Sequence, residues 1–190
     1  MTAAETDAEL ARGALAGDVR AQRALVDRHR DALYRLARTA TGDPEEALDV
    51  VQEAFLAAFG ALHRYDPARS LRGWLAAITL NKSRDWMRRQ KVRRFLRLPG
   101  SDDAALLVRD EAPLPDEVAQ QRDALAITAR AVAALPPNLK DVLLLRTTEG
   151  LSQTETALAL GVSEKAVETR LYRARQKLAA VLRDDPQARV

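Results

Sequence analysis

The chain has 190 residues, with 30 Lys or Arg against 27 Asp or Glu and a net charge of +3 near neutral pH. It has no cysteine and only two separated histidines, His29 and His63, a composition that excludes disulfides, thiolate zinc sites and thiol redox sensing. No apolar run reaches the length of a membrane span and no signal-peptide pattern is present, so we expect a cytoplasmic protein.

The charges are segregated along the sequence. Residues 64–97 hold eleven Lys or Arg and two Asp, whereas residues 99–124 hold seven acidic residues and two Arg. Residues 163–183 are basic again, with six Lys or Arg and two Glu. Two basic segments joined by an acidic one are typical of a protein that holds a polyanion, such as nucleic acid, at two places.

Helical periodicity predicts the first elements. Residues before Val19 are Ala-rich and acidic, and we assign them no function. A helix is expected from Val19 to a turn at residues 41–44. Asp43 then caps a second helix, which has proline at its first position and Glu46 three residues after the cap, and which ends near Leu62.

A Ser70 cap predicts a long helix over residues 71–94. Residues 96–117 contain three prolines without sustained periodicity, so we expect a linker there. Further helices are expected on either side of the break that Pro136 and Pro137 impose. The sequence therefore predicts an all-α fold of two small helical domains, at residues 19–96 and 123–183, joined by a flexible acidic linker.

The last part of the chain has the sequence pattern of a helix-turn-helix. Ser152 and Glu155 form a capping box for a short helix, and Gly161 supplies the turn that ends it. Ser163 caps a second helix, whose outward face is polar and basic. Such a helix suits the major groove of DNA. A plain helical hairpin with a charged outer face is the alternative.

Taken together, the chain resembles an extracytoplasmic-function, or group IV, sigma factor of bacterial RNA polymerase. The resemblance covers residues 19–96 (family region 2) and 123–182 (family region 4). The stretches that carry it are Ala-Leu-Asp-Val-Val-Gln-Glu-Ala-Phe at 47–55, Leu-Arg-Gly-Trp-Leu-Ala-Ala-Ile at 71–78 with Asn81 and Asp85, Leu135-Pro136, Leu-Gly-Val-Ser at 160–163, Val167, Thr-Arg-Leu at 169–171 and Arg-Ala-Arg at 173–175.

The resemblance implies a surface for core RNA polymerase, formed by the beta and beta-prime subunits. In the family, the stretch at 47–55 lies on the face that docks the clamp helices of the largest subunits. The residues carried over to this role are Asp49, Gln52, Glu53 and Phe55. Leu48 stands where the family commonly has an acid, and a solvated helix face is the alternative.

The resemblance also implies that region 2 melts the promoter and holds the minus-ten element, with the loop from Tyr65 to Ser70 capturing a flipped base. Bases unstacked onto aromatic surfaces, with cations along the phosphates, suit this task. Trp74 shares an apolar stripe and is expected in the core, whereas for Trp86 stacking and packing both remain open. The implied minus-ten contacts are Tyr65, Arg69, Arg72, Asn81, Arg84, Asp85, Arg88 and Arg89.

For the minus-thirty-five element, the resemblance implies recognition by the second helix of the helix-turn-helix. The family often has Gly-Thr-Val-Lys-Ser-Arg across 165–170, and the acid Glu168 in this chain leaves the base preference open. Arg175 has an alternative role, which is to stabilise the end of its helix or pair with a neighbouring acid. The implied contacts are Lys165, Ala166, Glu168, Thr169, Arg170, Arg173, Arg175 and Lys177.

The expected function is that of a sigma factor that directs core polymerase to specific promoters under the control of an anti-sigma factor. We expect it to be no enzyme, to need no cofactor or metal, and to be monomeric when free, without insertion into a membrane. One alternative is a sigma mimic that only sequesters an anti-sigma factor, which should lack the basic surfaces. Another is a helix-turn-helix transcriptional regulator, which would not need the polymerase-docking stretch.

Overall fold

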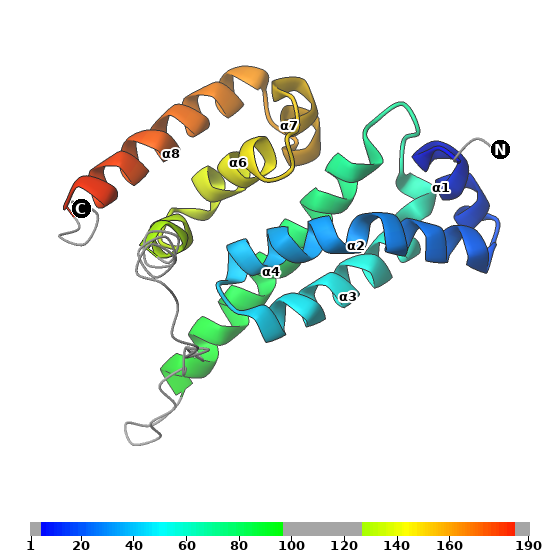
Figure 1. Cartoon of the computed structure of the whole chain (residues 1–190), viewed down its shortest axis with the longest axis horizontal. Coiled ribbons are helices and arrows are strands. Elements are labelled where there is room, and N and C mark those ends of the chain that lie inside the picture. The colour runs from blue at the N-terminus through cyan, green and yellow to red at the C-terminus, as the bar shows by residue number, and fades with distance from the viewer. Residues whose placement is uncertain (1–4, 97–126, 185–190) are drawn as a thin grey trace, which may run out of the picture.

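The computed structural model of the protein describes residues 5–96 and 127–184, and the expected acidic linker lies outside these ranges. Within them the secondary structure is helical, without a strand, and this confirms the predicted all-α fold. Figure 1 shows the helices arranged in two groups. No helix in the described residues is long and apolar enough to cross a membrane.

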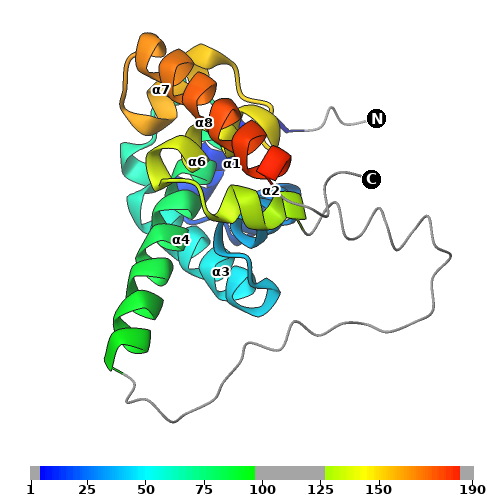
Figure 2. The same ribbon diagram turned by 90° about the vertical axis from the view of Figure 1, so that its left-hand side faces the viewer.

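The first group, which we call the N-terminal bundle, consists of four α-helices and a short 3-10 turn. Its elements are α1 (Asp7–Leu15), α2 (Val19–Thr41), α3 (Pro44–Ala61), η1 (Leu62–Arg64) and α4 (Leu71–Leu96). Helices α2, α3 and α4 pack against one another, and α1 packs on α2. In Figures 1 and 2 the end of α4 projects beyond the other helices, and it carries part of the basic segment seen in the sequence.

Local sequence explains the helix boundaries of this bundle. Helix α2 ends at Gly42, whose φ of 80° is a left-handed conformation that glycine adopts readily. The Asp43 carboxylate then accepts hydrogen bonds from the backbone N–H groups of Glu45 and Glu46, at 2.9 and 3.1 Å. These bonds satisfy donors that the first turn of a helix leaves unpaired, so the predicted cap is confirmed.

Helix α1 lies in the stretch to which the sequence assigned no function. It begins with a capping box of Thr6 and Glu9, and it buries Leu10 at 1% exposed in the common core. Asp7 fixes α1 to α2, because its carboxylate lies 2.7 Å from the Arg28 guanidinium and 3.1 Å from the His29 ring. The helix is therefore an integral layer of the N-terminal bundle.

The second group, the C-terminal bundle, begins with helical backbone at 127–133. It continues with α6 (Pro137–Thr147), α7 (Gln153–Leu160) and α8 (Glu164–Asp184). The predicted capping box of Ser152 and Glu155 is present, and Gly161 ends α7 with a φ of 64°. Val142, Ala157 and Val167 fill the angle between the helices, as a helix-turn-helix requires.

The two bundles pack together. Helices α6 and α7 contact α4, α6 also contacts α2, and α8 lies on the outer side of the C-terminal bundle (Figures 1 and 2). The buried apolar residues form a cluster that runs from Leu36 and Leu80 in one bundle to Leu143 and Leu151 in the other. Gly73 marks the close approach, since a Cβ atom at this position would lie 3.4 Å from a methyl carbon of Leu151.

Candidate nucleic-acid interface

Helix α8 presents a basic face to solvent. Val167 and Ala174, at 1% and 0% exposed, point into the C-terminal bundle and thereby fix which side of α8 faces outward. Of the residues predicted to contact the minus-thirty-five element, the exposed ones are Lys165, Glu168, Arg173, Arg175 and Lys177, and the partly buried ones are Ala166, Thr169 and Arg170. The predicted contacts therefore gather on one helix, with their charged members mostly in solvent.

Two contacts shape the start of this face. Glu168 pairs with Lys165 at 2.8 Å, so the unexpected acid is partly neutralised by its neighbour one turn earlier. The Thr169 hydroxyl donates to the carbonyl of Lys165 at 2.9 Å. Tyr172, which the sequence pattern did not single out, is 62% exposed and accepts a hydrogen bond from the Gln176 amide at 2.6 Å.

The loop between η1 and α4 is held by its own side chains. The Tyr65 hydroxyl donates to the backbone carbonyl of Arg69 at 2.7 Å, and the rings of Tyr65 and Trp74 pack with centroids 5.3 Å apart. Arg69 pairs with Asp66 at 3.3 Å. Burial raises the pKa of the Tyr65 hydroxyl, with smaller contributions from Asp7 and Asp66. The predicted base-capturing loop is thus a turn held by its own hydrogen bond and ion pair, with the Tyr65 ring packed on Trp74.

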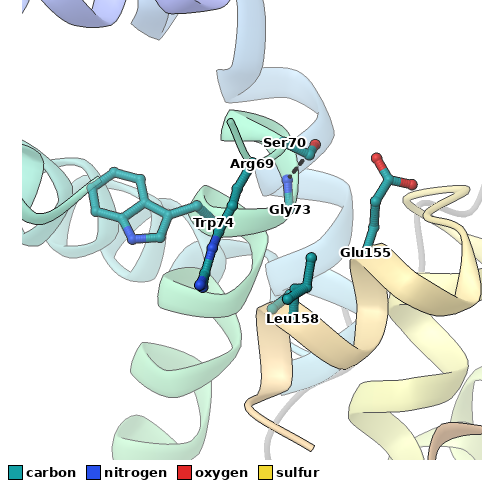
Figure 3. A pocket seen from close by; sticks show the side chains of 7 residues that line it. Arg69, Ser70, Gly73, Trp74, Glu155 and Leu158 are labelled. Carbon is teal, nitrogen blue, oxygen red and sulfur yellow. Dashed lines mark hydrogen bonds between the residues drawn. The ribbon is translucent and has the colours of Figure 1, made fainter. Parts of the chain in front are cut away.

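A pocket of about 60 Å³ lies between this loop and α7. Figure 3 shows Arg69 and Gly73 on the side of α4, with Leu158 facing them from α7. The Ser70 hydroxyl accepts a hydrogen bond from the Gly73 N–H at 3.2 Å and so caps α4 at the pocket wall. The lining residues are Arg69, Ser70, Gly73, Trp74, Glu155, Leu158 and Ala159.

The remaining predicted minus-ten residues lie along α4, and their side chains face different neighbours. Asp85 and Arg88 are exposed and pair with each other at 3.1 Å. Arg89 is exposed and lies 3.3 Å from Glu53 of α3. Asn81 is exposed and accepts a hydrogen bond from Arg84, whose guanidinium is turned toward the C-terminal bundle.

The tryptophans differ in position. Trp74 is partly buried and packs against the core, as its place in the apolar stripe predicted. Trp86 is 9% exposed and belongs to the core. Of the two roles that the sequence left open for Trp86, the structure selects packing.

Helix α3 carries the residues predicted to bind core polymerase. Asp49 and Gln52 are exposed, and Glu53 is half-buried between Lys82 at 3.6 Å and Arg89 at 3.3 Å.

Phe55 is only 7% exposed and stacks on Phe59 with ring centroids 6.1 Å apart, so its side chain supports α3 from the core rather than forming a surface contact. Its neighbour Leu56 is 73% exposed. Leu56 follows Asp49 and Gln52 at helical spacings of seven and four, which place all three on one face. That spacing is the signal that could have identified Leu56 as an exposed apolar residue of this face.

Charged side chains cross the contact between the two bundles. Arg72 of α4 pairs at 2.9 Å with Glu149, which is 1% exposed. Arg84 pairs at 3.1 Å with Asp141 of α6, which is 3% exposed. The Lys140 ammonium, also buried, donates to the carbonyl of Ala40 at 3.4 Å. Two predicted minus-ten arginines are therefore bound to acids of the C-terminal bundle.

Burial raises the pKa of the Asp141 carboxyl to about 6, and the cations Arg84, Lys140 and Arg170 reduce that shift without cancelling it. Burial also lowers the pKa of the Lys140 ammonium, which Asp141 partly offsets. A carboxyl whose folded-state pKa lies above its unfolded value stabilises the fold fully below the unfolded value. This stabilisation is lost as pH rises through about 6.

We therefore expect the stability of the wild-type protein relative to an Asp141→Asn variant to increase by about 1 kcal/mol between pH 7.5 and pH 5. The comparison with Asn cancels the contributions of Glu9 and Glu155, whose lowered pKa values give the opposite trend. Urea unfolding of both proteins at the two pH values measures the difference. Parallel pH profiles of the two proteins would contradict the predicted titration of Asp141.

The two histidines differ in exposure. His29 is buried in α2 beside Asp7, and His63 is exposed on η1. The described residues contain no group of three or more His, Asp or Glu side chains able to hold a metal ion.

Comparison with known proteins identifies relatives of both bundles. Residues 25–93 match the family Sigma-70 region 2, and residues 125–178 match the family Sigma-70, region 4. RNA polymerase sigma factor CnrH of Cupriavidus metallidurans is 41% identical over 191 residues, covering 98% of this chain and all of CnrH. ECF RNA polymerase sigma factor SigM of Mycobacterium tuberculosis is 36% identical over 93% of this chain and 85% of SigM.

Solved structures give the same picture. CnrH in complex with the cytosolic domain of CnrY is similar with a TM-score of 0.70 and 37% identity, over 95% of this chain and 99% of that chain. RpoE of Bartonella quintana, in complex with the anti-sigma factor NepR, shares the fold with a TM-score of 0.63 and 19% identity, over 86% of this chain and 97% of that chain.

Proposed function

The chain belongs to the sigma-70 family as an RNA polymerase sigma factor of the extracytoplasmic-function type, and we propose that its two bundles divide the recognition of a promoter. Residues 19–96 serve as region 2, residues 97–122 as the linker and residues 123–183 as region 4. The protein supplies specificity in the cytoplasm, and the polymerase to which it binds performs the chemistry.

The observation that carries this proposal is the outward basic face of α8. Its apolar side is fixed in the helix-turn-helix by Val167 and Ala174, so Lys165, Glu168 and Arg173 face solvent together. A helix held in this way can enter the major groove with its N-terminal residues at base edges and its later cations at phosphates. We assign the minus-thirty-five element to this face.

The minus-ten element is assigned to the start and outer side of α4. The loop from Tyr65 to Ser70 is backed by an aromatic pair, a feature that suits a base removed from the stack. Exposed arginines along the projecting end of α4, including Arg88 and Arg89, suit the phosphates beside it.

Core polymerase is assigned to the outward face of α3. Asp49 and Gln52 supply polar groups, and the exposed Leu56 supplies an apolar surface of the kind that protein interfaces bury. Leu48, 55% exposed, lies at the edge of this face and supplies a second apolar contact.

We expect an Asp49→Lys substitution to weaken binding to core polymerase by at least about tenfold, because a charge reversal removes a partner and introduces repulsion at a docking face. Asp31→Lys is the matched control, since Asp31 is an exposed acid on α2, away from the α3 face. Fluorescence anisotropy with labelled protein and purified core polymerase measures both. Equal affinity for the two variants would remove Asp49 from the docking surface.

Control by an anti-sigma factor is part of the proposal. The related CnrH has been solved with the cytosolic domain of CnrY, and RpoE with the anti-sigma factor NepR. The basic faces of α4 and α8 argue against a mimic that only sequesters such a regulator, because a mimic has no use for DNA-binding surfaces.

A further inference from the structure

Helix α8 carries two acids in the turns that the proposed function places against DNA, Glu164 and Glu168. The helix-turn-helix itself accounts for Glu164. Its carboxylate accepts a hydrogen bond from the Thr154 hydroxyl at 2.9 Å, and its backbone carbonyl accepts one from the Gln153 amide at 3.2 Å. Glu168 instead faces solvent, with a side chain 58% exposed. Because DNA phosphates repel an acid in this position, the Glu168 carboxylate needs another explanation.

The ion pair that Glu168 makes is easily exchanged. Lys165, one turn earlier, lies 2.8 Å from the Glu168 carboxylate, and its side chain is 79% exposed. An ion pair in solvent contributes little to stability, because water screens the charges and both side chains lose freedom. Lys165 and Glu168 can therefore exchange each other for the edges of DNA bases without a large loss of free energy.

The other residues assigned to base edges in these turns are less suited to reading them. Ala166 has no polar side-chain atom, and the Thr169 hydroxyl donates to the carbonyl of Lys165 at 2.9 Å. Arg170 is half-buried, and its charge acts on Asp141 of α6. Readout by hydrogen bonds at the N-terminal end of α8 therefore falls to Lys165 and Glu168.

The chemistry of a carboxylate limits the bases that it can recognise. In the major groove, guanine and thymine present acceptor atoms, which repel a carboxylate. Adenine presents its N6 donor beside the acceptor N7, whereas cytosine presents the N4 amino donor without a neighbouring acceptor. Cytosine is therefore the base that best fits an acid on a recognition helix.

We propose that Glu168 sets promoter specificity by accepting a hydrogen bond from the N4 amino group of a cytosine in the minus-thirty-five element. The inference rests on the proposed function, which places α8 in the major groove, and it names a base that this site selects. At a promoter with another base there, the carboxylate loses water without gaining a donor. Such a promoter is discriminated against by an unsatisfied acid as well as by a missing bond.

The experiment uses holoenzyme assembled from purified core polymerase and the full chain. The probe is a library of linear DNA duplexes, each with a random segment, long enough to contain both promoter elements, upstream of a transcribed barcode. Sequencing of the transcripts and of the input library gives the enrichment of each base at each position. The wild type and each variant are compared on the same library.

We expect the wild type to enrich cytosine at one position of the upstream element by about fivefold or more over the least favoured base. In Glu168→Gln the preference at this position should change to adenine, because a glutamine amide pairs with N6 and N7 of adenine. In Glu168→Lys it should change to guanine, whose O6 and N7 accept hydrogen bonds from an ammonium group. The other positions of the element should keep their preferences.

Asp31→Asn is the control for Glu168→Gln, because both substitutions remove one negative charge and Asp31 is exposed on α2. It should reproduce the wild-type preference at every position. A change of base that occurs in Glu168→Gln alone therefore reports the side chain at position 168 and not the net charge of the protein.

An enriched upstream element with the same base preferences in the wild type and in both Glu168 variants would overturn the proposal and leave the sigma assignment intact. A wild-type preference for a base other than cytosine at the position that responds would overturn it as well. If the wild type enriched no upstream element, the assignment of α8 to the minus-thirty-five element would fail, and the inference would fail with it.

Discussion

An Arg173→Glu substitution is expected to lower promoter-specific initiation by about tenfold or more while leaving core polymerase binding unchanged. Arg173 is exposed on the basic face of α8, whereas the polymerase surface is assigned to α3. Reversal removes a cation near phosphate and replaces it with an anion that repels DNA, so binding to promoter DNA should weaken and depend less steeply on salt. Run-off transcription and polymerase binding, measured on the same preparation, give the two readouts.

The control for this substitution is Arg35→Glu, which makes the same charge change at an exposed position of α2. It should leave both readouts near the wild-type values. Arg170 is a less clean test, because it is half-buried and contributes to the electrostatics of Asp141. Equal loss of initiation and polymerase binding in Arg173→Glu would contradict the assignment of α8 to DNA.

The largest expected loss of stability is that of Leu36→Ala in α2. Leu36 is 0% exposed in the core of the N-terminal bundle, so truncation removes apolar contacts and leaves a cavity. Such substitutions cost about 2–5 kcal/mol, a large fraction of the 5–15 kcal/mol that is typical of a folded domain. Urea unfolding followed by circular dichroism should show the midpoint falling accordingly.

The matched control is Leu56→Ala, the same substitution at a side chain 73% exposed on α3. Surface changes of this kind usually alter stability by less than about 0.5 kcal/mol. If both variants lost stability equally, Leu56 would have to be packed in solution and could not form part of a free docking surface.

Helix boundaries could be predicted from the sequence because their causes are local. The capping box of Ser152 and Glu155, the Asp43 cap and the turn at Gly161 each depend on residues within one helical turn. The apolar spacing that placed Val167 in the core of the helix-turn-helix is equally local.

Which side chain of a helix is buried is hard to predict where adjacent residues are both apolar. Phe55 and Leu56 are neighbours, and one residue turns a helical side chain by about 100°, so choosing the wrong one reverses core and surface. The same ambiguity left Trp86 undecided between stacking and packing until its neighbours in space were known.

The contact between the bundles could not be predicted at all. Glu149 precedes a glycine in an ordinary turn, and nothing around it in sequence indicates a partner 77 residues away. The charge segregation suggested two basic segments that bind DNA. It did not reveal that acidic residues of the C-terminal bundle pair with arginines of the N-terminal bundle. Long-range pairing of this kind depends on the packing of α6 and α7 against α4.

The most direct test of the central claim is run-off transcription with purified core polymerase, with and without this protein, on a pooled library of genomic promoters. We expect discrete transcripts that appear only when the protein is added, and alignment of their upstream sequences should reveal two conserved elements, at minus ten and minus thirty-five. Failure of the protein to bind core polymerase, together with the absence of any added transcript, would contradict its role as a sigma factor.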